Sequence, residues 1–256
     1  MDPKTAPRTR LFVTADLNAG EVIELEDGQI HHLVNVLRLT DGAPIALFNG
    51  RDGEWLAEIE RAGKRHYRAR IGQPLRDQES GPDLWLLFAP IKRRPIDLIG
   101  EKATELGAAL LWPVITGRTN VARVNLERLG KGVIEAAQQC GRLGVPELRP
   151  PAPLGEVIAA WPAGRRLLVL DESGTAPPIA EVLGNAPPRG GDAILIGPEG
   201  GFARSELDAM AKQAFVRRVG MGRRILRAET AAIAALACWQ ALIGDWRAAG
   251  PEKIGK

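Results

Sequence analysis

The sequence predicts an α/β protein with a mostly parallel sheet in its C-terminal part, preceded by a small β-barrel module. Two observations support this prediction. Residues 10–73 contain segments in which apolar and polar residues alternate, as in strands with one buried face. From Leu84 onward, strands that are apolar throughout alternate with helical segments, which is typical of a parallel sheet covered on both faces.

Composition and charge exclude several classes of protein. The chain has 256 residues, of which 45% are hydrophobic and 25% charged, as in an ordinary globular protein. Its net charge of +3 permits a polyanionic partner without requiring one. The two cysteines, Cys140 and Cys238, have no CxxC neighbour, which disfavours a disulfide framework or a zinc site. No apolar run approaches the ~18 residues of a membrane span, and no signal-peptide core is present, so we expect a cytoplasmic protein without a membrane partner.

The N-terminal region reads as β-rich. Asn49-Gly50 closes one apolar run and predicts a turn. In 30–39, apolar residues at helical spacing predict a short helix between strands. The polar, Gly- and Pro-rich stretch 72–83 predicts a linker, and we expect domains over 1–74 and 75–256. Strands are expected at 11–17, 43–50, 55–60 and 65–71.

In the C-terminal region, predicted strands alternate with predicted helices. Pro95 suits the first turn of a helix and Gly107 suits its end. The final segment is Ala-rich and broadly apolar, so it suits either the core or a dimer interface. Strands are predicted at 84–90, 108–116, 167–172, 193–197 and 215–220, and helices at 95–106, 126–140, 177–184, 204–214 and 229–246.

A glycine loop follows one buried strand, in 194-ILIGPEGGF-202. Gly197, Gly200 and Gly201 let the backbone bend sharply and approach a ligand, and ligands of open α/β sheets bind at carboxyl ends of strands. The pattern is neither the GxGxxG of dinucleotide sites nor a Walker phosphate loop. A tight strand-to-helix connection without a ligand is the alternative. Ser205 with Asp208 resembles a capping box for the next helix.

A second loop, 220-GMGRRILRAETA-231, is rich in arginine. Five arginines occur in the eleven residues 217–227. Such a run is usually a solvated face. Here the arginines lie in a glycine loop at a strand end and are interrupted by Ile225 and Leu226, which favours a ligand site.

These segments together resemble a known family. GPEGGF followed by MGRRILRAETA is similar to the signature of the ribosomal RNA small subunit methyltransferase E (RsmE) family, of the SPOUT class. The resemblance is colinear and covers nearly the whole chain. One departure is Met221, where the family usually has leucine; the two side chains have similar volume. Further segments that carry the resemblance are 32-HLVNVLR-38, 47-LFNG-50, 92-KRRPIDLIGEKATELGA-108, 118-RTN-120 and 135-EAAQQCGRLGVPEL-148.

The resemblance implies both a fold and an activity. It implies an N-terminal PUA-like barrel, a C-terminal α/β domain with a deep trefoil knot, and a homodimer. It also implies transfer of a methyl group from S-adenosylmethionine to N3 of a uridine in 16S ribosomal RNA, free or in the small ribosomal subunit. The cofactor-binding positions that it implies are Leu170, Ile196, Gly197, Pro198, Glu199, Gly200, Gly201, Met221, Gly222, Ile225 and Leu226.

The chemistry of the reaction suggests roles for charged residues. N3 of uridine carries a proton, so catalysis needs stabilisation of negative charge on the uracil oxygens. We predict Arg227 for this role, with Arg118 as second choice. Glu229 is predicted either to take the proton or to favour the start of its helix through the dipole. Because the sulfonium of the donor is positive, the arginines are assigned to the RNA side.

Contacts to RNA phosphates are expected from basic residues in three places. Residues 61–70 carry five Lys or Arg, and a charged edge strand that prevents aggregation is the alternative there. Lys92 and Arg94, which follow the predicted strand 84–90, either bind phosphate or keep their loop soluble. The predicted RNA contacts are Arg65, Arg68, Arg70, Lys92, Arg94, Arg223 and Arg224.

Two other functions stay open at this point. A relative that methylates ribose 2′-hydroxyls would use the same fold, although the N-terminal barrel favours the base-modifying family. The second alternative function is that of a non-catalytic RNA-binding protein, which the intact glycine loops disfavour. No metal is expected, because His31, His32 and His66 lack a metal-binding arrangement.

Overall fold

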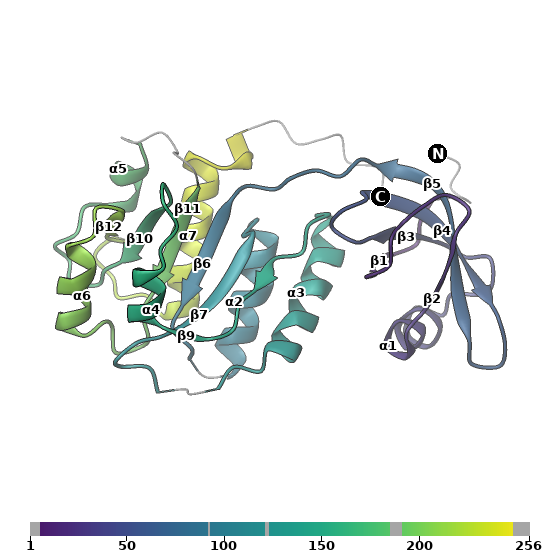
Figure 1. Cartoon of the computed structure of the whole chain (residues 1–256), viewed down its shortest axis with the longest axis horizontal. Coiled ribbons are helices and arrows are strands. Elements are labelled where there is room, and N and C mark those ends of the chain that lie inside the picture. The colour runs from purple at the N-terminus through teal and green to yellow at the C-terminus, as the bar shows by residue number, and fades with distance from the viewer. Residues whose placement is uncertain (1–5, 92, 121–122, 185–190, 248–256) are drawn as a thin grey trace. The chain divides into compact units, whose positions relative to one another are not determined.

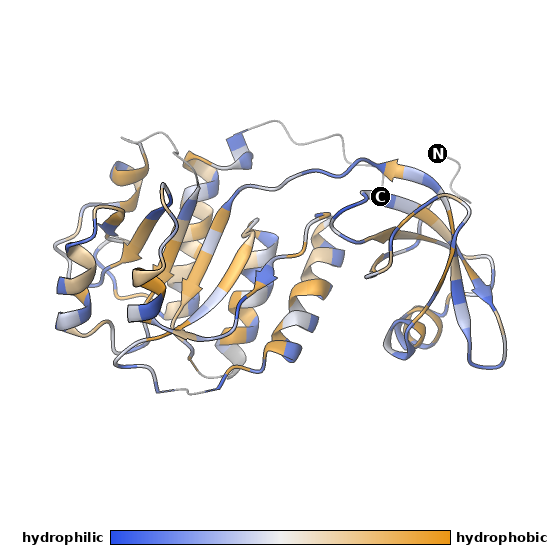
Figure 2. Ribbon diagram, in the orientation of Figure 1, coloured by the Kyte–Doolittle hydropathy of each residue, from blue (hydrophilic) through white to orange (hydrophobic). Residues whose placement is uncertain are grey.

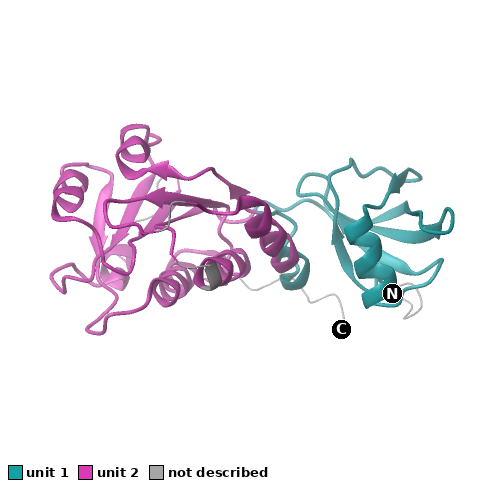
Figure 3. Ribbon diagram, turned by 90° about the horizontal axis from the view of Figure 1, so that it is seen from below, with its two compact units in different colours: residues 1–80, 137–145 teal, residues 81–136, 146–256 magenta. Residues whose placement is uncertain are grey.

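The computed structural model describes residues 6–91, 93–120, 123–184 and 191–247, without the side chains of residues 93 and 94. The chain forms two compact units (Figure 3). Unit 1 comprises residues 1–80 together with 137–145, and unit 2 comprises 81–136 together with 146–256. Unit 1 is therefore built from two separate stretches of the chain.

Unit 1 contains a curled, mostly antiparallel sheet in the order β1-β3-β4-β5-β2 (Figure 1). The predicted alternation is confirmed on β4, where Ala57 and Ile59 are fully buried, and on β5, where Ala69 and Ile71 are. These side chains fill one apolar core. The strands are β1 (Arg10–Phe12), β2 (Val22–Glu24), β3 (Pro44–Phe48), β4 (Glu54–Arg61) and β5 (Tyr67–Arg76).

The turn between β3 and β4 forms where Asn49-Gly50 predicts it. Gly50 adopts a φ of +80°, which favours glycine. The Asn49 side-chain oxygen accepts hydrogen bonds from the backbone N–H groups of Arg51 and Asp52, both at 2.9 Å. An asparagine that bonds its own turn in this way fixes the register of the hairpin.

The predicted linker begins too early. Strand β5 continues to Arg76. In this last part, Pro74 pairs with Trp55 of β4 and Arg76 pairs with Glu54, and the register between the two strands shifts at these residues. The pairing partner on β4 keeps the chain extended despite its Gly and Pro content, so a tertiary contact overrides a local signal.

The short helix predicted over 30–39 is present, but it starts earlier and changes from an α-helix to a π-helix. Helix α1 (Asp27–Ile30) continues into a π-helix, η1 (His31–Val36), in which the Leu37 N–H donates to the His32 carbonyl at 2.9 Å. Arg38 then ends the helix with a φ of 56°, the one non-glycine residue in the left-handed region among the described residues. Leu33 is the buried anchor of this segment.

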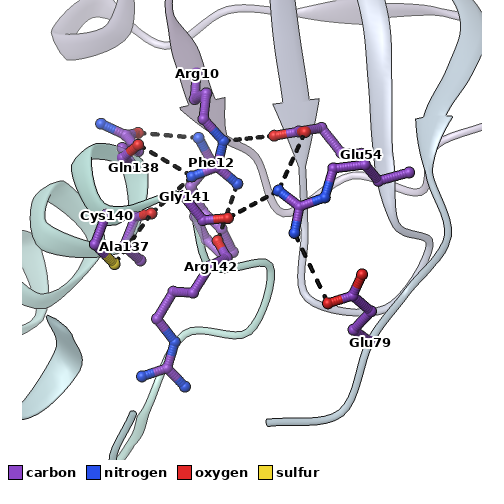
Figure 4. A network of polar contacts seen from close by, with 10 residues as sticks. Arg10, Phe12, Glu54, Glu79, Ala137, Gln138, Cys140, Gly141 and Arg142 are labelled. Carbon is purple, nitrogen blue, oxygen red and sulfur yellow. Dashed lines mark hydrogen bonds and ion pairs between the residues drawn. The ribbon is translucent and has the colours of Figure 1, made fainter. Parts of the chain in front are cut away.

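The end of helix α3 (Leu126–Cys140) belongs to unit 1 and is held there by arginine (Figure 4). The Arg10 guanidinium donates to the carbonyls of Ala137, Gln138 and Arg142 at 2.8, 3.0 and 2.9 Å. The last carbonyls of a helix lack intrahelical partners, so a cation at this position satisfies them and complements the helix dipole.

A buried carboxylate holds this arginine in place. Glu54 pairs with Arg10 at 2.5 Å and with Arg76 at 3.6 Å, and only 7% of its side chain is exposed. Arg76 in turn donates to the Gly141 carbonyl at 2.9 Å. The residues 137–145 are thus tied to unit 1 by a connected polar network (Figure 4).

Unit 2 contains a sheet in the order β12-β10-β11-β6-β7-β8, with β9 paired to β7 (Figure 1). All of these strand pairs are parallel, which confirms the predicted parallel sheet. The central strands are hydrophobic along their length (Figure 2). The strands are β6 (Leu84–Phe88), β7 (Leu110–Ile115), β8 (Glu147–Leu148), β9 (Ala152–Pro153), β10 (Arg166–Leu170), β11 (Asp192–Ile196) and β12 (Val216–Val219).

Helices cover the sheet, and most lie where the periodicity predicts them. Leu154, Val157 and Met210 from α4 and α6 pack into one core with alternate strand residues. Helix α7 packs on β11 beside α2 and α5, so its Ala-rich face lies in the core. Three short elements, α4, β8 and β9, were not expected from the sequence. The helices are α2 (Arg93–Glu105), α4 (Leu154–Ala159), α5 (Ile179–Gly184), α6 (Arg204–Ala211), α7 (Ala228–Leu242) and the 3-10 turn η2 (Asp245–Arg247).

The predicted capping box of α6 is wrong. The residue before the helix is Ala203, and Ser205 and Asp208 lie inside it. The Glu206 carboxylate accepts the Ala203 N–H at 2.8 Å, so it supplies the carboxylate half of a capping box, while alanine has no oxygen to supply the other half. The motif is therefore shifted by two residues and is one-sided.

A buried aspartate fastens α7 to the sheet. Asp192 on β11 accepts the Trp239 indole N–H at 2.7 Å and forms two hydrogen bonds with Arg166 on β10, at 2.8 and 3.0 Å. These bonds fix the C-terminal part of α7 at the start of β10 and β11. No helix within the described ranges is long and apolar enough to cross a membrane.

Candidate active site

The carboxyl ends of the unit 2 strands lie at one edge of the sheet. Because all pairs are parallel, the loops that follow β7, β10, β11 and β12 leave the sheet at this same edge. Leu170 and Ile196 end the neighbouring strands β10 and β11 and are both buried beneath these loops. The two predicted site segments, after β11 and after β12, are therefore brought to one edge.

The GPEGG loop after β11 is a tight turn in which Gly201 has a left-handed backbone and Gly197 lies close to a ring. The Gly201 N–H donates to the Pro198 carbonyl at 2.8 Å, and Gly201 has a φ of +66°. A Cβ on Gly197 would stand 3.0 Å from the ring of Phe202, which is buried beneath the loop. Glu199 and Gly200 are the exposed residues of this loop.

Arg118, predicted as a catalytic residue, lies against this loop. Its guanidinium donates to the Gly200 carbonyl at 2.7 Å. The neighbouring Gly117 N–H donates to Glu206 at 2.7 Å. The loop after β7 is thus joined by two hydrogen bonds to the GPEGG loop and to the helix that follows it, which limits the freedom of both loops.

Glu172 is a site residue that sequence reasoning did not select. It follows β10, is exposed, and its carboxylate stands so close to Gly201 that a Cβ there would collide with it. Glu172 and Arg118 therefore approach the GPEGG loop with opposite charges. Its position at the carboxyl end of a buried strand was the available signal, because such positions carry ligands in open α/β sheets.

Two of the five arginines near the second loop have structural roles. Arg218 forms an ion pair with Asp171, with its Nε at 2.6 Å from the carboxylate, and Arg217 donates to the carbonyls of Ala214 and Val216. Burial raises the pKa of Asp171, but the Ser173 N–H and the Arg218 guanidinium outweigh it and hold that pKa below its usual value. This pair links β10 to β12 at the site edge.

The arginine loop itself is anchored at its start and open at its centre. Gly220 exchanges backbone hydrogen bonds with the 177–179 segment. Gly222 has a φ of +92°, a Cβ added to it would meet no atom within 4 Å, and Ile225 is 82% exposed. Met221 and Leu226 are half-buried. The centre of the loop is therefore exposed, with one apolar side chain, Ile225, between its arginines.

The remaining cationic and acidic candidates lie beside this loop. Arg223, Arg224 and Arg227 are exposed, and Arg227 occupies the position immediately before α7 without a side-chain cap bond. Glu229 lies in the first turn of α7, half-buried. The predicted favourable position of its carboxylate at the helix start is confirmed, while its role as a base stays a prediction.

The predicted RNA contacts of unit 1 are a separate group, and two of them are already paired. Arg70 bonds Glu60 at 2.5 and 3.2 Å, and Arg68 lies 4.0 Å from Glu24. Arg65 is exposed before β5. In unit 2, Lys92 and the side chain of Arg94 lie outside the described residues. Within the residues that the structure covers, no group of three His, Cys, Asp or Glu side chains is placed to hold a metal ion.

Family models match both parts of the chain. An RNA methyltransferase domain matches residues 78–240, and an RNA methyltransferase PUA domain matches residues 25–72. The first match alone spans more than half of the chain and includes both loops of the site edge.

Three similar proteins share one description. The ribosomal RNA small subunit methyltransferase E of Rickettsia conorii is 34% identical over 234 residues, covering 89% of this chain and 93% of that protein. The protein of the same description from Synechocystis is 30% identical and covers 91% of this chain and 78% of its own length. A crystal structure of ribosomal RNA small subunit methyltransferase E from Neisseria gonorrhoeae, bound to S-adenosyl methionine, is 31% identical with a TM-score of 0.83, covering 93% of this chain and 99% of that one.

Proposed function

Since the chain belongs to the ribosomal RNA small subunit methyltransferase E family, we propose that it methylates N3 of a uridine in 16S ribosomal RNA, using S-adenosylmethionine. At the coarser level it is an S-adenosylmethionine-dependent ribosomal RNA methyltransferase. The meeting of the GPEGG loop and the arginine loop at one edge of the sheet supports methyl transfer, and the N-terminal PUA domain favours a base over a ribose as the acceptor.

The residues at this edge fit a methyl donor. The glycine loop is exposed at Glu199 and Gly200, where the Gly200 carbonyl already accepts from Arg118, and a Cβ on Gly222 would meet no atom within 4 Å. We assign the donor to the GPEGG loop and to the backbone of 221–226, above the buried ends of β10 and β11. A sulfonium carries positive charge, so Glu172 suits its surroundings better than the arginines do.

In the proposed reaction, N3 of the uracil attacks the methyl carbon in line with the sulfur. The N–CH₃ bond forms as the S–CH₃ bond breaks, the sulfonium becomes a thioether, and N3 loses its proton. Alignment of donor and acceptor removes much of the barrier. Arg227, exposed at the start of α7, is assigned to the negative charge on the uracil oxygens, with Arg118 as second choice and Glu229 as candidate proton acceptor.

We also propose a homodimer that acts in the cytoplasm, on free 16S ribosomal RNA or on the small subunit. Leu242 and Trp246, at the end of α7 and just beyond it, are exposed apolar side chains, which supports an interface there. Light scattering after gel filtration tests this proposal. A particle of twice the 27.6 kDa chain mass is expected, and a monomer would contradict it.

The experiment that tests the function is methylation of deproteinised ribosomal RNA and of isolated small subunits, followed by nucleoside mass spectrometry. We expect 3-methyluridine. Appearance of 2′-O-methyl nucleosides would indicate the ribose-modifying alternative. Calorimetry that detects no binding of S-adenosylmethionine would indicate a non-catalytic RNA-binding protein.

A further inference from the structure

The segment His31–Arg38 ends in an exposed surface that the proposed reaction does not use. We call its exposed members, His31, Asn35, Val36, Leu37 and Arg38, the helical tip. Val36 is 58% exposed and Leu37 39%. Two adjacent apolar side chains therefore lie at the surface of this segment, next to the charge of Arg38.

The backbone of the helical tip departs from an ordinary α-helix at two places. The π-winding of His31–Val36 is rare and occurs frequently at functional sites. Arg38 follows in the left-handed region, where glycine or asparagine is preferred. The closing hydrogen bond, from the Leu39 N–H to the Leu33 carbonyl at 2.9 Å, is a backbone bond that glycine at position 38 would form equally well. The arginine side chain is therefore not explained by the fold.

The charge of the helical tip differs from that of the basic strand β5. On β5, Arg68 and Arg70 face Glu24 and Glu60, so their charges are largely balanced. Residues 28–40 contain two histidines and Arg38 but no Asp or Glu. Arg38 forms no ion pair or hydrogen bond within the described part of the chain, so its charge is available to an anion.

We propose that the helical tip, and not the basic face of β5, is the surface with which unit 1 contacts ribosomal RNA. Arg38 contacts a phosphate, and Val36 with Leu37 contact unstacked bases, a combination suited to a single-stranded segment. The apolar part consists of two side chains, far short of the roughly 20 to 30 residues a side of a stable protein interface. The proposal rests on the proposed function, because ribosomal RNA is the substrate there.

The decisive variant is Arg38→Gly in the full-length protein. Glycine relieves the left-handed backbone, so thermal stability is expected to be equal or higher, and the affinity for S-adenosylmethionine unchanged. Binding to deproteinised 16S ribosomal RNA is expected to weaken by roughly 3- to 10-fold, and the slope of log K against log salt to fall by about one. Val36→Ser is expected to weaken RNA binding without changing that slope.

Arg70→Gln is the matched control, since Arg70 is paired with Glu60. It is expected to leave RNA affinity within about twofold of wild type. The proposal is wrong if Arg38→Gly binds RNA with wild-type affinity and salt slope, or if Arg70→Gln has the larger effect. It is also wrong if Val36→Ser changes the oligomeric mass instead. Failure of the wild-type protein to methylate ribosomal RNA would count against the proposed function alone, because the binding comparison does not need turnover.

Discussion

At the scale of single residues, two glycines of this chain differ in whether the structure would tolerate a side chain at their position. Gly201 has a φ of +66° and lies against the Glu172 carboxylate, so the site fixes its identity. Gly132 lies inside α3, where an added Cβ would meet no atom within 4 Å, so nothing in the packing demands glycine there. The local geometry thus favours glycine at position 201 and does not require it at position 132.

Gly201→Ala is expected to lower the affinity for S-adenosylmethionine by at least about tenfold, because the left-handed backbone and the carboxylate must both shift. Calorimetry measures this. Gly132→Ala is the control and is expected to stabilise the protein by about 0.5–1 kcal/mol in urea unfolding, with cofactor affinity unchanged. Wild-type cofactor affinity in Gly201→Ala would contradict the assignment of the donor to this loop.

Arg227→Ala tests whether the side chain of Arg227 contacts the uracil while the backbone of the arginine loop contacts the methyl donor. Because its guanidinium is assigned to the uracil and not to the donor, kcat is expected to fall roughly 100-fold while the affinity for S-adenosylmethionine stays unchanged. Arg204→Ala, an exposed arginine at the start of α6, is the control and should retain activity. If cofactor affinity falls as far as the rate, Arg227 belongs to the donor side.

At the scale of elements, the site edge is held by links between loops and strands. Arg118 joins the loop after β7 to the loop after β11, and Asp171 with Arg218 joins β10 to β12. The Asp171 side chain is only 3% exposed. These links keep the loops close to the geometry that a bound ligand needs, so less ordering is required on binding.

Asp171→Asn should show a pH-dependent loss of stability. The folded-state pKa of Asp171 is lowered, so the carboxylate stabilises the fold above its unfolded pKa of about 3.9, and this contribution is lost as pH falls through the folded-state value. Near pH 7 the variant is expected to be less stable by about 1 kcal/mol in urea unfolding. The gap should close towards pH 3. A gap that is constant with pH would show that the ionised carboxylate is not the cause.

At the scale of the whole molecule, a unit of the fold need not be one stretch of chain. Unit 1 takes residues 137–145 from the middle of the sequence and fixes them through Arg10, Arg76 and the buried Glu54. Removing Glu54 would leave the two guanidinium groups without their counter-charge, although Arg10 and Arg76 would keep their carbonyl acceptors. The network should therefore matter to the stability of unit 1 and not to the chemistry of the site.

Glu54→Ala is expected to destabilise unit 1 by about 3 kcal/mol, seen as earlier unfolding and faster limited proteolysis within residues 6–80. Glu58→Ala, an exposed glutamate on the same strand, is the control and should be nearly neutral. Affinity for S-adenosylmethionine should be retained in both variants. Loss of that affinity in Glu54→Ala would mean that the network also supports unit 2.

The amino-acid sequence alone was enough to locate most of the elements and to identify the family. Apolar runs and helical periodicity located nearly every strand and long helix of unit 2, and the colinear motifs identified the ribosomal RNA small subunit methyltransferase E family with its PUA domain, both of which are confirmed. The trefoil knot, the domain boundary at residue 74 and the roles of the site residues stay predictions. Local patterns suffice for elements because burial of one face repeats with the period of the backbone.

Only the tertiary structure decided which charges are free. Arg70 and Arg218 look the same in sequence as Arg38 and Arg223, but the first two meet carboxylates from distant segments, and the others meet none among the described residues. The approach of Glu172 to Gly201 and the capture of residues 137–145 by unit 1 are likewise long-range. The physical reason is that the effect of a charge depends on its neighbours in space, and strand pairing sets those neighbours without leaving a periodic trace in the chain.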